Sequence, residues 1–359
     1  MKQTYWLVSL SVPSTTIRLD KRITLTTLVL CCLGAMLALF SLTLGSYPVS
    51  ALQIWQTLTG DAVPLLHTVL IDWRLPRVFM ALCTGAALGM SGAIFQSLLR
   101  NPLGSPDVIG FNTGAYTGAL ITVILLKGSY LQMAFGSILG GCLTALLIYA
   151  LAWQNGVARF RLIIVGIAVS ASLHGVNVWL MMSSTLESAM TAALWSTGSL
   201  NGMTWEKALP PSALCLLLMI FCLGLTRPMQ LMEMGDELAQ SLGIRVNKTR
   251  ALLTISATAL TAAATAMTGP VAFIALSAPQ IAQRLTKAPV LSPLAAAATG
   301  GLLLLSADML AQHAIPNIQL PVGIITVSLG GLYLVAYFGL SGHLFRFHPA
   351  RRFGVIRPA

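Results

Sequence analysis

The sequence predicts an all-α integral membrane protein with about ten transmembrane helices. Hydrophobic residues make up 56% of its 359 positions and charged residues only 9%, and its mean hydropathy is +0.81. A soluble protein carries about 25% charged residues, whereas helices that face lipid need none. The net charge of +11 comes without the clustered basic stripe of a nucleic-acid-binding surface and suits the cytoplasmic loops of a membrane protein.

Ten apolar stretches have roughly the length needed to cross a hydrocarbon core of about 30 Å. Their approximate spans are 24–46, 75–98, 107–126, 131–153, 161–182, 209–226, 250–268, 271–286, 293–312 and 320–340. The first stretch is too long for the apolar part of a signal peptide, so we expect a retained helix. The eighth is short, with Pro270 at its start and Pro279 inside it, so we expect it to be broken or partly re-entrant, as is tolerated where protein shields the backbone from lipid.

Basic residues divide unequally between the two sides of these helices. With ten helices both termini lie on one side, and that side collects 17 of the 21 Lys and Arg residues. The other side receives the remaining four: Arg74, Arg77, Lys127 and Lys207. The basic side of a membrane protein is cytoplasmic. We therefore expect a cytoplasmic segment over 1–23, a transmembrane domain over 24–340 and a basic cytoplasmic tail over 341–359.

The chain contains a short internal echo. "GAALGMSG" over 85–92 resembles "AAATAMTG" over 262–269, and the two segments lie in predicted helices that run in opposite directions, each near one of two four-helix blocks. Two inverted four-helix repeats with a pathway between them are typical of transporters. Small residues are also common wherever membrane helices pack closely, so helix packing is the alternative reading of the echo.

Longer motifs follow one another in order along the chain. They are "RLPR" (74–77), "GAALGMSGAIFQSLLRNPLGSPDVIGFNTGA" (85–115), "LGIRVNKTR" (242–250), "GPVAFIALSAPQIAQRL" (269–285) and "LPVGIITVSLGG" (320–331). Together they resemble the permease family for iron-siderophore and cobalamin import, over about residues 24–340. Within that family the chain is most similar to the ferric-enterobactin permeases of the heterodimeric type, through "RNPLGSPDVIGFNTGA" and "LWSTGSLNGMTW" (194–205).

This resemblance implies the membrane subunit of an ABC importer in the bacterial cytoplasmic membrane. The implied substrate is a ferric siderophore, a catecholate such as ferric enterobactin. The implied partners are a second permease subunit, two cytoplasmic ABC ATPases and a periplasmic siderophore-binding protein. A second copy of this chain and a paralogue are both compatible with the sequence as the second permease.

Arg74 and Arg77 lie on the side of the membrane that the charge count makes external. The resemblance implies that they receive carboxylates of the binding protein, and arginine is well suited to this because its guanidinium can hold a carboxylate through two hydrogen bonds. The alternative is that both anchor a helix end at the lipid headgroups. Some relatives carry a further arginine near the outer end of the ninth helix, where this chain has Gln312 and His313, so the docking surface here has fewer charges.

The longest polar interruption on the cytoplasmic side runs from Arg227 to Arg250. We expect two short helices separated near Gly243, with acids early in a helix, where the helix dipole favours them. In the family that the chain resembles, this loop lies in a groove of the ATPase and transmits its movement. The resemblance therefore implies a set of coupling residues: Glu233, Gly235, Asp236, Leu242 and Gly243. The alternative is an ordinary solvated loop.

The chain carries no phosphate-binding G-x-x-x-x-G-K-[ST] motif, so we expect a partner ATPase to use the ATP and no enzymatic site in this chain. Its five histidines are scattered and its acids are not paired at a ligand spacing. We therefore expect no metal site and no bound cofactor.

Three polar residues inside the apolar spans are candidates for the translocation path: Gln96, Asn177 and Asp308. Polar groups in hydrocarbon face a partner or a cavity, so a hydrogen bond between helices is the alternative for each. A secondary transporter of a small solute would share the inverted repeats and would carry ionisable residues at mid-membrane; Asp308 is the candidate for such a role. A membrane-embedded enzyme would need a catalytic cluster, and the sequence shows none.

Overall fold

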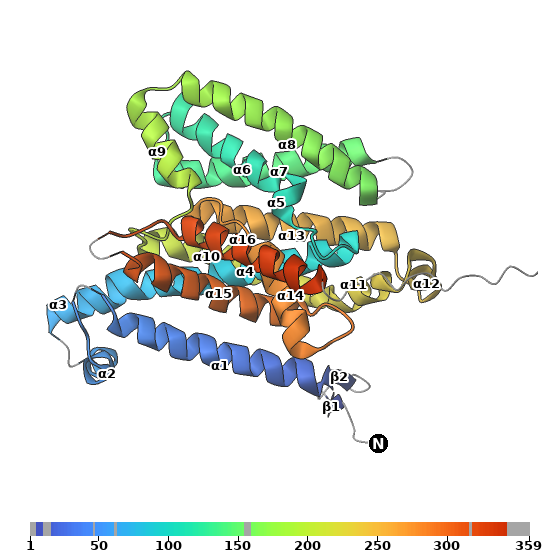
Figure 1. Ribbon diagram of the computed structural model, residues 1–359, viewed down its shortest axis with the longest axis horizontal. Helices are drawn as coiled ribbons and strands as arrows, with labels where there is room; N and C mark the ends of the chain where they lie inside the picture. The colour runs from blue at the N-terminus through green and yellow to red at the C-terminus, as the bar shows by residue number, and fades with distance from the viewer. Residues whose placement is uncertain are drawn as a thin grey trace, which may run out of the picture.

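The computed structural model describes residues 5–9, 16–45, 47–60, 63–153, 159–315 and 318–342. Figure 1 shows that helices make up almost all of the described chain. In chain order the elements are β1 (Tyr5–Ser9), β2 (Thr16–Asp20), α1 (Lys21–Thr43), α2 (Ala51–Thr59), α3 (Pro64–His67), the π-helix η1 (Thr68–Arg74), α4 (Leu75–Leu99), α5 (Pro106–Ile109), α6 (Phe111–Leu120), the π-helix η2 (Ile121–Leu125), α7 (Tyr130–Ala152), α8 (Arg159–Met182), α9 (Leu186–Ser196), α10 (Trp205–Gly224), α11 (Thr226–Glu233), α12 (Asp236–Ser241), α13 (Val246–Thr268), α14 (Ile274–Thr286), α15 (Pro293–His313) and α16 (Val322–Gly342).

The helices confirm the predicted all-α membrane fold. Seven segments of the described chain are long and apolar enough to cross a membrane: α1, the continuous run from α3 to α4, α7, α8, α10, α13 and α15. Two shorter apolar helices cover 111–125 and 322–336, and α14 has 13 residues. These ten segments coincide with the ten predicted stretches. The second is longer than predicted, because α3 and η1 precede α4 without a gap and extend the span to Pro64–Leu99.

The hairpin of β1 and β2 was not predicted. The two strands pair antiparallel, with Tyr5 opposite Asp20. Their sequences, "YWLVS" and "TIRLD", are rich in the aromatic and β-branched residues that favour strands. The chain then turns directly into α1, because Asp20 caps that helix by accepting from the backbone N–H of Arg22 at 2.8 Å and of Ile23 at 3.3 Å.

Helix α4 forms the centre of the molecule and is largely buried. It packs against α15 with almost no space between the backbones, since a Cβ added at Gly85 would lie 2.3 Å from the carbonyl oxygen of Gly300. Small residues allow membrane helices this close approach. On another face α4 contacts α13, where the Ser91 hydroxyl lies 2.7 Å from the Thr261 hydroxyl. The first copy of the internal echo therefore packs against the helix that carries the second.

The eighth stretch is shorter than predicted but is not broken internally, since α14 runs from Ile274 to Thr286 through Pro279. The interruption lies before it: helix α13 ends at Thr268, and α14 begins only at Ile274. Between them, Gly269 has φ 73° and Phe273 has φ 68°. A bulky residue with positive φ is uncommon, so the tertiary structure holds this turn in a conformation that the local sequence disfavours.

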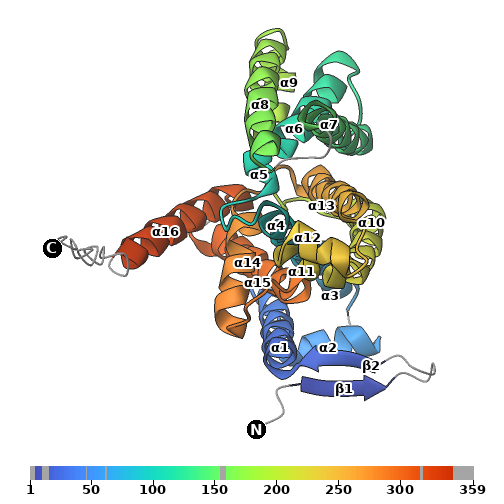
Figure 2. The same cartoon turned by 90° about the vertical axis from the view of Figure 1, so that its right-hand side faces the viewer.

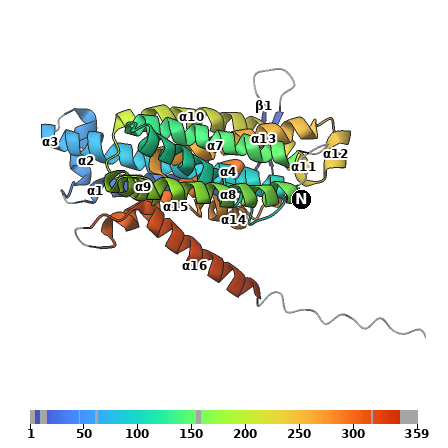
Figure 3. The same ribbon diagram turned by 90° about the horizontal axis from the view of Figure 1, so that it is seen from above.

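The remaining helices stand around this centre. Figure 2 shows α6, α7, α8 and α9 on one side of the centre, with α5 between them and α4, while α1 lies on the opposite side. Helix α7 packs directly against α13. Seen from above, α16 slants away from the other helices (Figure 3). Helices α11 and α12 lie together at the end of the molecule where α4 ends and α13 begins (Figure 1).

Candidate functional site

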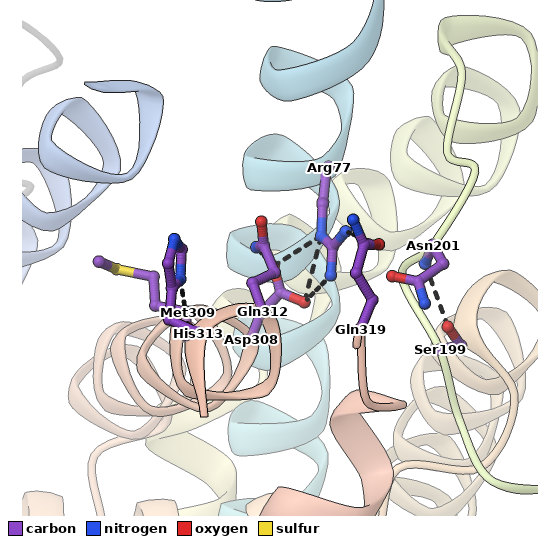
Figure 4. Close-up of polar contacts among 8 residues, drawn as sticks. All are labelled: Arg77, Ser199, Asn201, Asp308, Met309, Gln312, His313 and Gln319. Carbon is purple, nitrogen blue, oxygen red and sulfur yellow. Dashed lines mark hydrogen bonds and ion pairs between the residues drawn. The ribbon is translucent and has the colours of Figure 1, made fainter. Parts of the chain in front are cut away.

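One cluster of polar side chains lies near the start of α4, where Arg77 forms a bidentate ion pair with Asp308 of α15 (Figure 4). The Arg77 Nε donates to Asp308 Oδ2 at 2.9 Å and Nη2 donates to Oδ1 at 2.9 Å. Gln312 donates to Asp308 Oδ2 at 2.8 Å. The Asp308 side chain is completely buried. The acid thus connects its own helix, α15, to α4.

The ion pair changes what Arg77 can offer to a partner protein. Two of its three nitrogens are occupied by Asp308, whose negative charge cancels the charge of the guanidinium. The third nitrogen, Nη1, has only a long contact of 3.4 Å to Gln319 Oε1. Arg77 also lines an open pocket of about 430 Å³ together with Trp73, Leu200, Met203, Thr204 and Gln319. It is therefore a fixed group in the wall of a pocket and not an extended arm.

Arg74 has a different environment. Its Nη1 donates to the Leu42 carbonyl oxygen at 2.6 Å, and its Nη2 donates to the carbonyl oxygen of Tyr47. Helix α1 ends at Thr43, so Arg74 satisfies a carbonyl of its last turn, where a positive charge is favourable. Carbonyl oxygens are neutral, so these contacts leave the positive charge of Arg74 uncancelled. The sequence alone indicates no intrachain partner for either arginine, whereas in the structure both have one.

A second cluster lies at the opposite end of α4, around Asp236 at the start of α12. Its Oδ2 accepts from Arg250 of α13 at 2.7 Å, and its Oδ1 accepts from Arg100 at 3.4 Å. The same Nη2 of Arg100 donates to the carbonyl oxygen of Met232 in α11. Sequence reasoning included Asp236 among the coupling residues but missed Arg100 and Arg250. The available signal was that each of these arginines lies near the cytoplasmic end of an apolar helix, Arg100 after α4 and Arg250 near the start of α13.

The polar segment from Arg227 to Arg250, called here the coupling segment after its predicted role, is divided differently from the prediction. The two short helices α11 and α12 separate at Gly235, whose φ of 136° and ψ of 146° favour glycine. Gly243 instead ends α12. The Ile244 N–H donates to the carbonyl of Ala239, the Gly243 N–H donates to that of Gln240, and Gly243 has φ 83°. This is a Schellman motif, in which glycine is favoured because the residue must be left-handed.

The coupling segment has one buried and one exposed apolar face. Met229, Met232 and Ala239 are buried against the helices, whereas Met234, Leu238 and Leu242 are exposed, at 65%, 43% and 56%. These last three residues are spaced four apart. Large exposed apolar side chains on a polar segment are typical of a protein–protein contact.

Glu233, the last residue of α11, lies under this segment. Burial raises the pKa of its carboxyl group above the ordinary value, and the Ser97 hydroxyl and the nearby Arg100 act in the opposite direction. Its Oε1 is buried without a hydrogen-bond partner among the described residues. Glu233 therefore faces inward, toward the end of α4.

The other two path candidates are also buried. Gln96 donates to the Leu276 carbonyl at 2.9 Å and so connects α4 to α14. Asn177 in α8 is 3% exposed, and neither polar atom of its side chain has a partner among the described residues. Across all the residues that the structure describes, no group of three or more His, Cys, Asp or Glu residues is placed to hold a metal ion.

Sequence reasoning also missed Asp107 of α5. Its carboxylate accepts from the Asn112 amide and from the backbone N–H of Phe273, and Asn112 in turn accepts from the Thr265 hydroxyl at 3.2 Å. These contacts connect α5 and α6 to the strained turn between α13 and α14. An acid inside an apolar stretch was the available signal, because such residues need a partner.

Comparison with known proteins gives consistent matches over most of the chain. The model of the FecCD transport family matches residues 31–338. The ferric enterobactin transport system permease protein FepG of Escherichia coli (strain K12) is 48% identical over 319 residues, which cover 89% of this chain and 97% of FepG. The Fe(3+) dicitrate transport system permease protein FecD of the same strain is 34% identical, over 83% and 93% of the two chains. A solved structure of a metal-chelate type ABC transporter in an inward-facing conformation matches with a TM-score of 0.80 at 26% identity, over 88% of this chain and 99% of the other.

Proposed function

This chain belongs to the FecCD transport family, and on that basis we propose that it is the membrane-spanning permease subunit of an ABC importer for a ferric siderophore. The observation that carries this proposal is the 48% identity to FepG over nearly the whole of both chains. The match to a metal-chelate type ABC transporter supports it independently at the level of the fold. The substrate class that FepG suggests is a catecholate, ferric enterobactin.

The energy comes from partner subunits in this proposal. The importer combines this chain with a second permease subunit, two cytoplasmic ABC ATPases and a periplasmic siderophore-binding protein, and the ATPases use the ATP. Loss of the cognate ATPase from cells should abolish growth on the ferric siderophore. Unchanged growth would favour a secondary transporter, which is indifferent to the ATPase.

We further propose that both termini are cytoplasmic, with the permease domain over 24–340 between segments 1–23 and 341–359. Much of the first segment and nearly all of the last lie outside the described residues. Single cysteines that replace Arg227 and Lys207 should react with a membrane-impermeant thiol reagent from opposite faces, because an odd number of membrane crossings separates them. The cysteine at Lys207 should react from outside intact cells. Reaction of both from the outside would contradict the ten-helix arrangement.

The coupling role of the segment around Gly243 is also a proposal, supported by its exposed face of Met234, Leu238 and Leu242. Replacing Gly243 with tryptophan should leave the protein in the membrane but reduce uptake for each ATP hydrolysed. No neighbouring atom lies within 4 Å of the position where its Cβ would be, so the variant should not clash inside this chain. It must instead adopt a strained positive φ and place an indole against the ATPase. Gly224→Trp is a matched control, since Gly224 is also uncrowded but has no positive φ. Normal coupling in Gly243→Trp would contradict the proposal and show that the segment is only a linker.

For docking of the binding protein, we propose that Arg74 supplies the net positive charge that attracts carboxylates of that protein. Arg77 contributes a hydrogen-bond donor, its Nη1, which is held in the wall of the pocket. Among the candidates for the translocation path, Asn177 keeps that role in our proposal because its amide has no partner among the described residues. Gln96 and Asp308 are already used in contacts between helices.

A further inference from the structure

The charge cluster around Asp236 connects the coupling segment to two different transmembrane helices at once. One carboxylate oxygen faces Arg100, directly after α4, and the other faces Arg250, in the second turn of α13. The Arg250 side chain is mostly buried, at 12% exposure, whereas Asp236 is 39% exposed. Asp236 thus lies at the surface, where a bound partner protein can displace it. The two arginines that it contacts belong to the ends of α4 and α13, which run into the transmembrane core.

The backbone at Arg100 supports a specific role for its side chain. Arg100 ends α4 in a Schellman motif, since its N–H donates to the Ser97 carbonyl and the Asn101 N–H donates to the Gln96 carbonyl. The left-handed position of this motif favours glycine, yet Arg100 occupies it with φ 48°. A departure from a local backbone preference is expected where a side chain serves another purpose. Here the guanidinium reaches Met232 of α11 and Asp236 of α12.

The two helices that meet at Asp236 also meet in the core. The Ser91 hydroxyl of α4 donates to the Ala257 carbonyl of α13 at 2.8 Å, in addition to its contact with Thr261. Helix α4 packs against α15 as well, and Gln96 connects it to α14. A displacement at Asp236 is therefore applied to the ends of two helices whose middles are in direct contact.

We propose that Asp236 is a positioning residue that divides the movement of the partner ATPase between α4, through Arg100, and α13, through Arg250. This inference rests on the proposed function and deepens it. Asp236 is 39% exposed, unlike fully buried Asp308, and an ion pair with an exposed partner adds little to folding stability. Asparagine at this position also keeps an oxygen that can accept from Arg250, so we expect removal of the charge to change coupling more than stability. The exposed face of Met234, Leu238 and Leu242 contacts the ATPase, and Asp236 passes the movement on.

The test uses the complete importer in proteoliposomes with the binding protein, and it measures siderophore uptake for each ATP hydrolysed. Asp236→Asn keeps the shape of the side chain and removes its charge, so the ratio should fall by about fivefold or more, the usual range for coupling between sites. The ATPase should remain bound. Glu237→Gln is the matched control, because Glu237 is the adjacent exposed acid, and its ratio should equal that of the wild type.

A double-mutant cycle separates transmission from simple packing. Arg100→Gln and Arg250→Gln should each lower the ratio, and combining either with Asp236→Asn should add little, since both partners act through the same acid. Additive losses, or a wild-type ratio in Asp236→Asn, would overturn the inference. Loss of ATPase binding in Asp236→Asn would overturn it too, because the residue would then be part of the docking surface. Uptake by the wild type without ATP would instead contradict the proposed function itself.

Discussion

Replacing Asp308 with alanine should destabilise the protein by about 3–5 kcal/mol, the usual cost of leaving one charge of a buried ion pair without its partner. Asp308 is completely buried, and it receives two nitrogens of Arg77 and the amide of Gln312. Its loss leaves a guanidinium that is 13% exposed between two helices, α4 and α15, that pack closely. A lower apparent melting temperature in detergent and a reduced amount of protein in the membrane should both be measurable.

Two comparisons isolate the ion pair as the cause. Glu187→Ala removes an exposed acid and should change stability by no more than about 0.5 kcal/mol. The double replacement Arg77→Met with Asp308→Leu should recover most of the loss, because a well-packed apolar pair often substitutes for a buried ion pair at no cost. If Asp308→Ala melts at the wild-type temperature, the pair does not hold α4 to α15.

The second large effect concerns the docking of the binding protein. Arg74→Met should slow association by about tenfold at low salt, since attraction between opposite charges acts mainly on the association rate. Arg74→Lys keeps the charge and should retain most of that rate, although lysine cannot form the same two contacts with the carbonyl groups of Leu42 and Tyr47. The wild-type rate should fall as salt rises. Stopped-flow or surface-plasmon measurements with the purified complex would give these rates.

The Arg74 variants also distinguish a role of Arg74 in docking from a role only in capping the end of α1. If Arg74 only closes the end of α1, then Met and Lys should both lower the melting temperature, and neither should change the association rate. Arg77 is unsuitable for this experiment. Its reversal to glutamate would place a second carboxylate beside buried Asp308, and a loss of docking could not then be separated from a loss of the fold.

Apolar length predicted the helices well, because a bilayer fixes how long a spanning helix must be. The ends of α15 agree with the expectation to within one residue, inside the usual uncertainty at helix ends, whereas Pro279 did not break α14 as expected. The extension of the second span through η1 was not predictable from length alone, since a π-helix begins there without a sequence signal that we recognised.

Side-chain partners were much harder to predict than helices. Asp308 and Arg77 are 231 positions apart, and hydropathy cannot show that α4 and α15 place them together. The same holds for Asp236, whose partners Arg100 and Arg250 come from two different helices. The arginines of "RLPR" were noticed for their unusual side of the membrane, but a charge count cannot reveal that one of them is neutralised inside the protein.

Siderophore uptake by proteoliposomes tests the central claim most directly. The vesicles contain this chain, its second permease subunit and the ATPase, with the binding protein loaded with ferric enterobactin on the other side from the ATP. We predict uptake that requires both ATP and an intact ATPase and that does not respond when an ion gradient is collapsed. Uptake that continues without ATP and stops when the gradient is collapsed would show a secondary transporter and contradict the assignment.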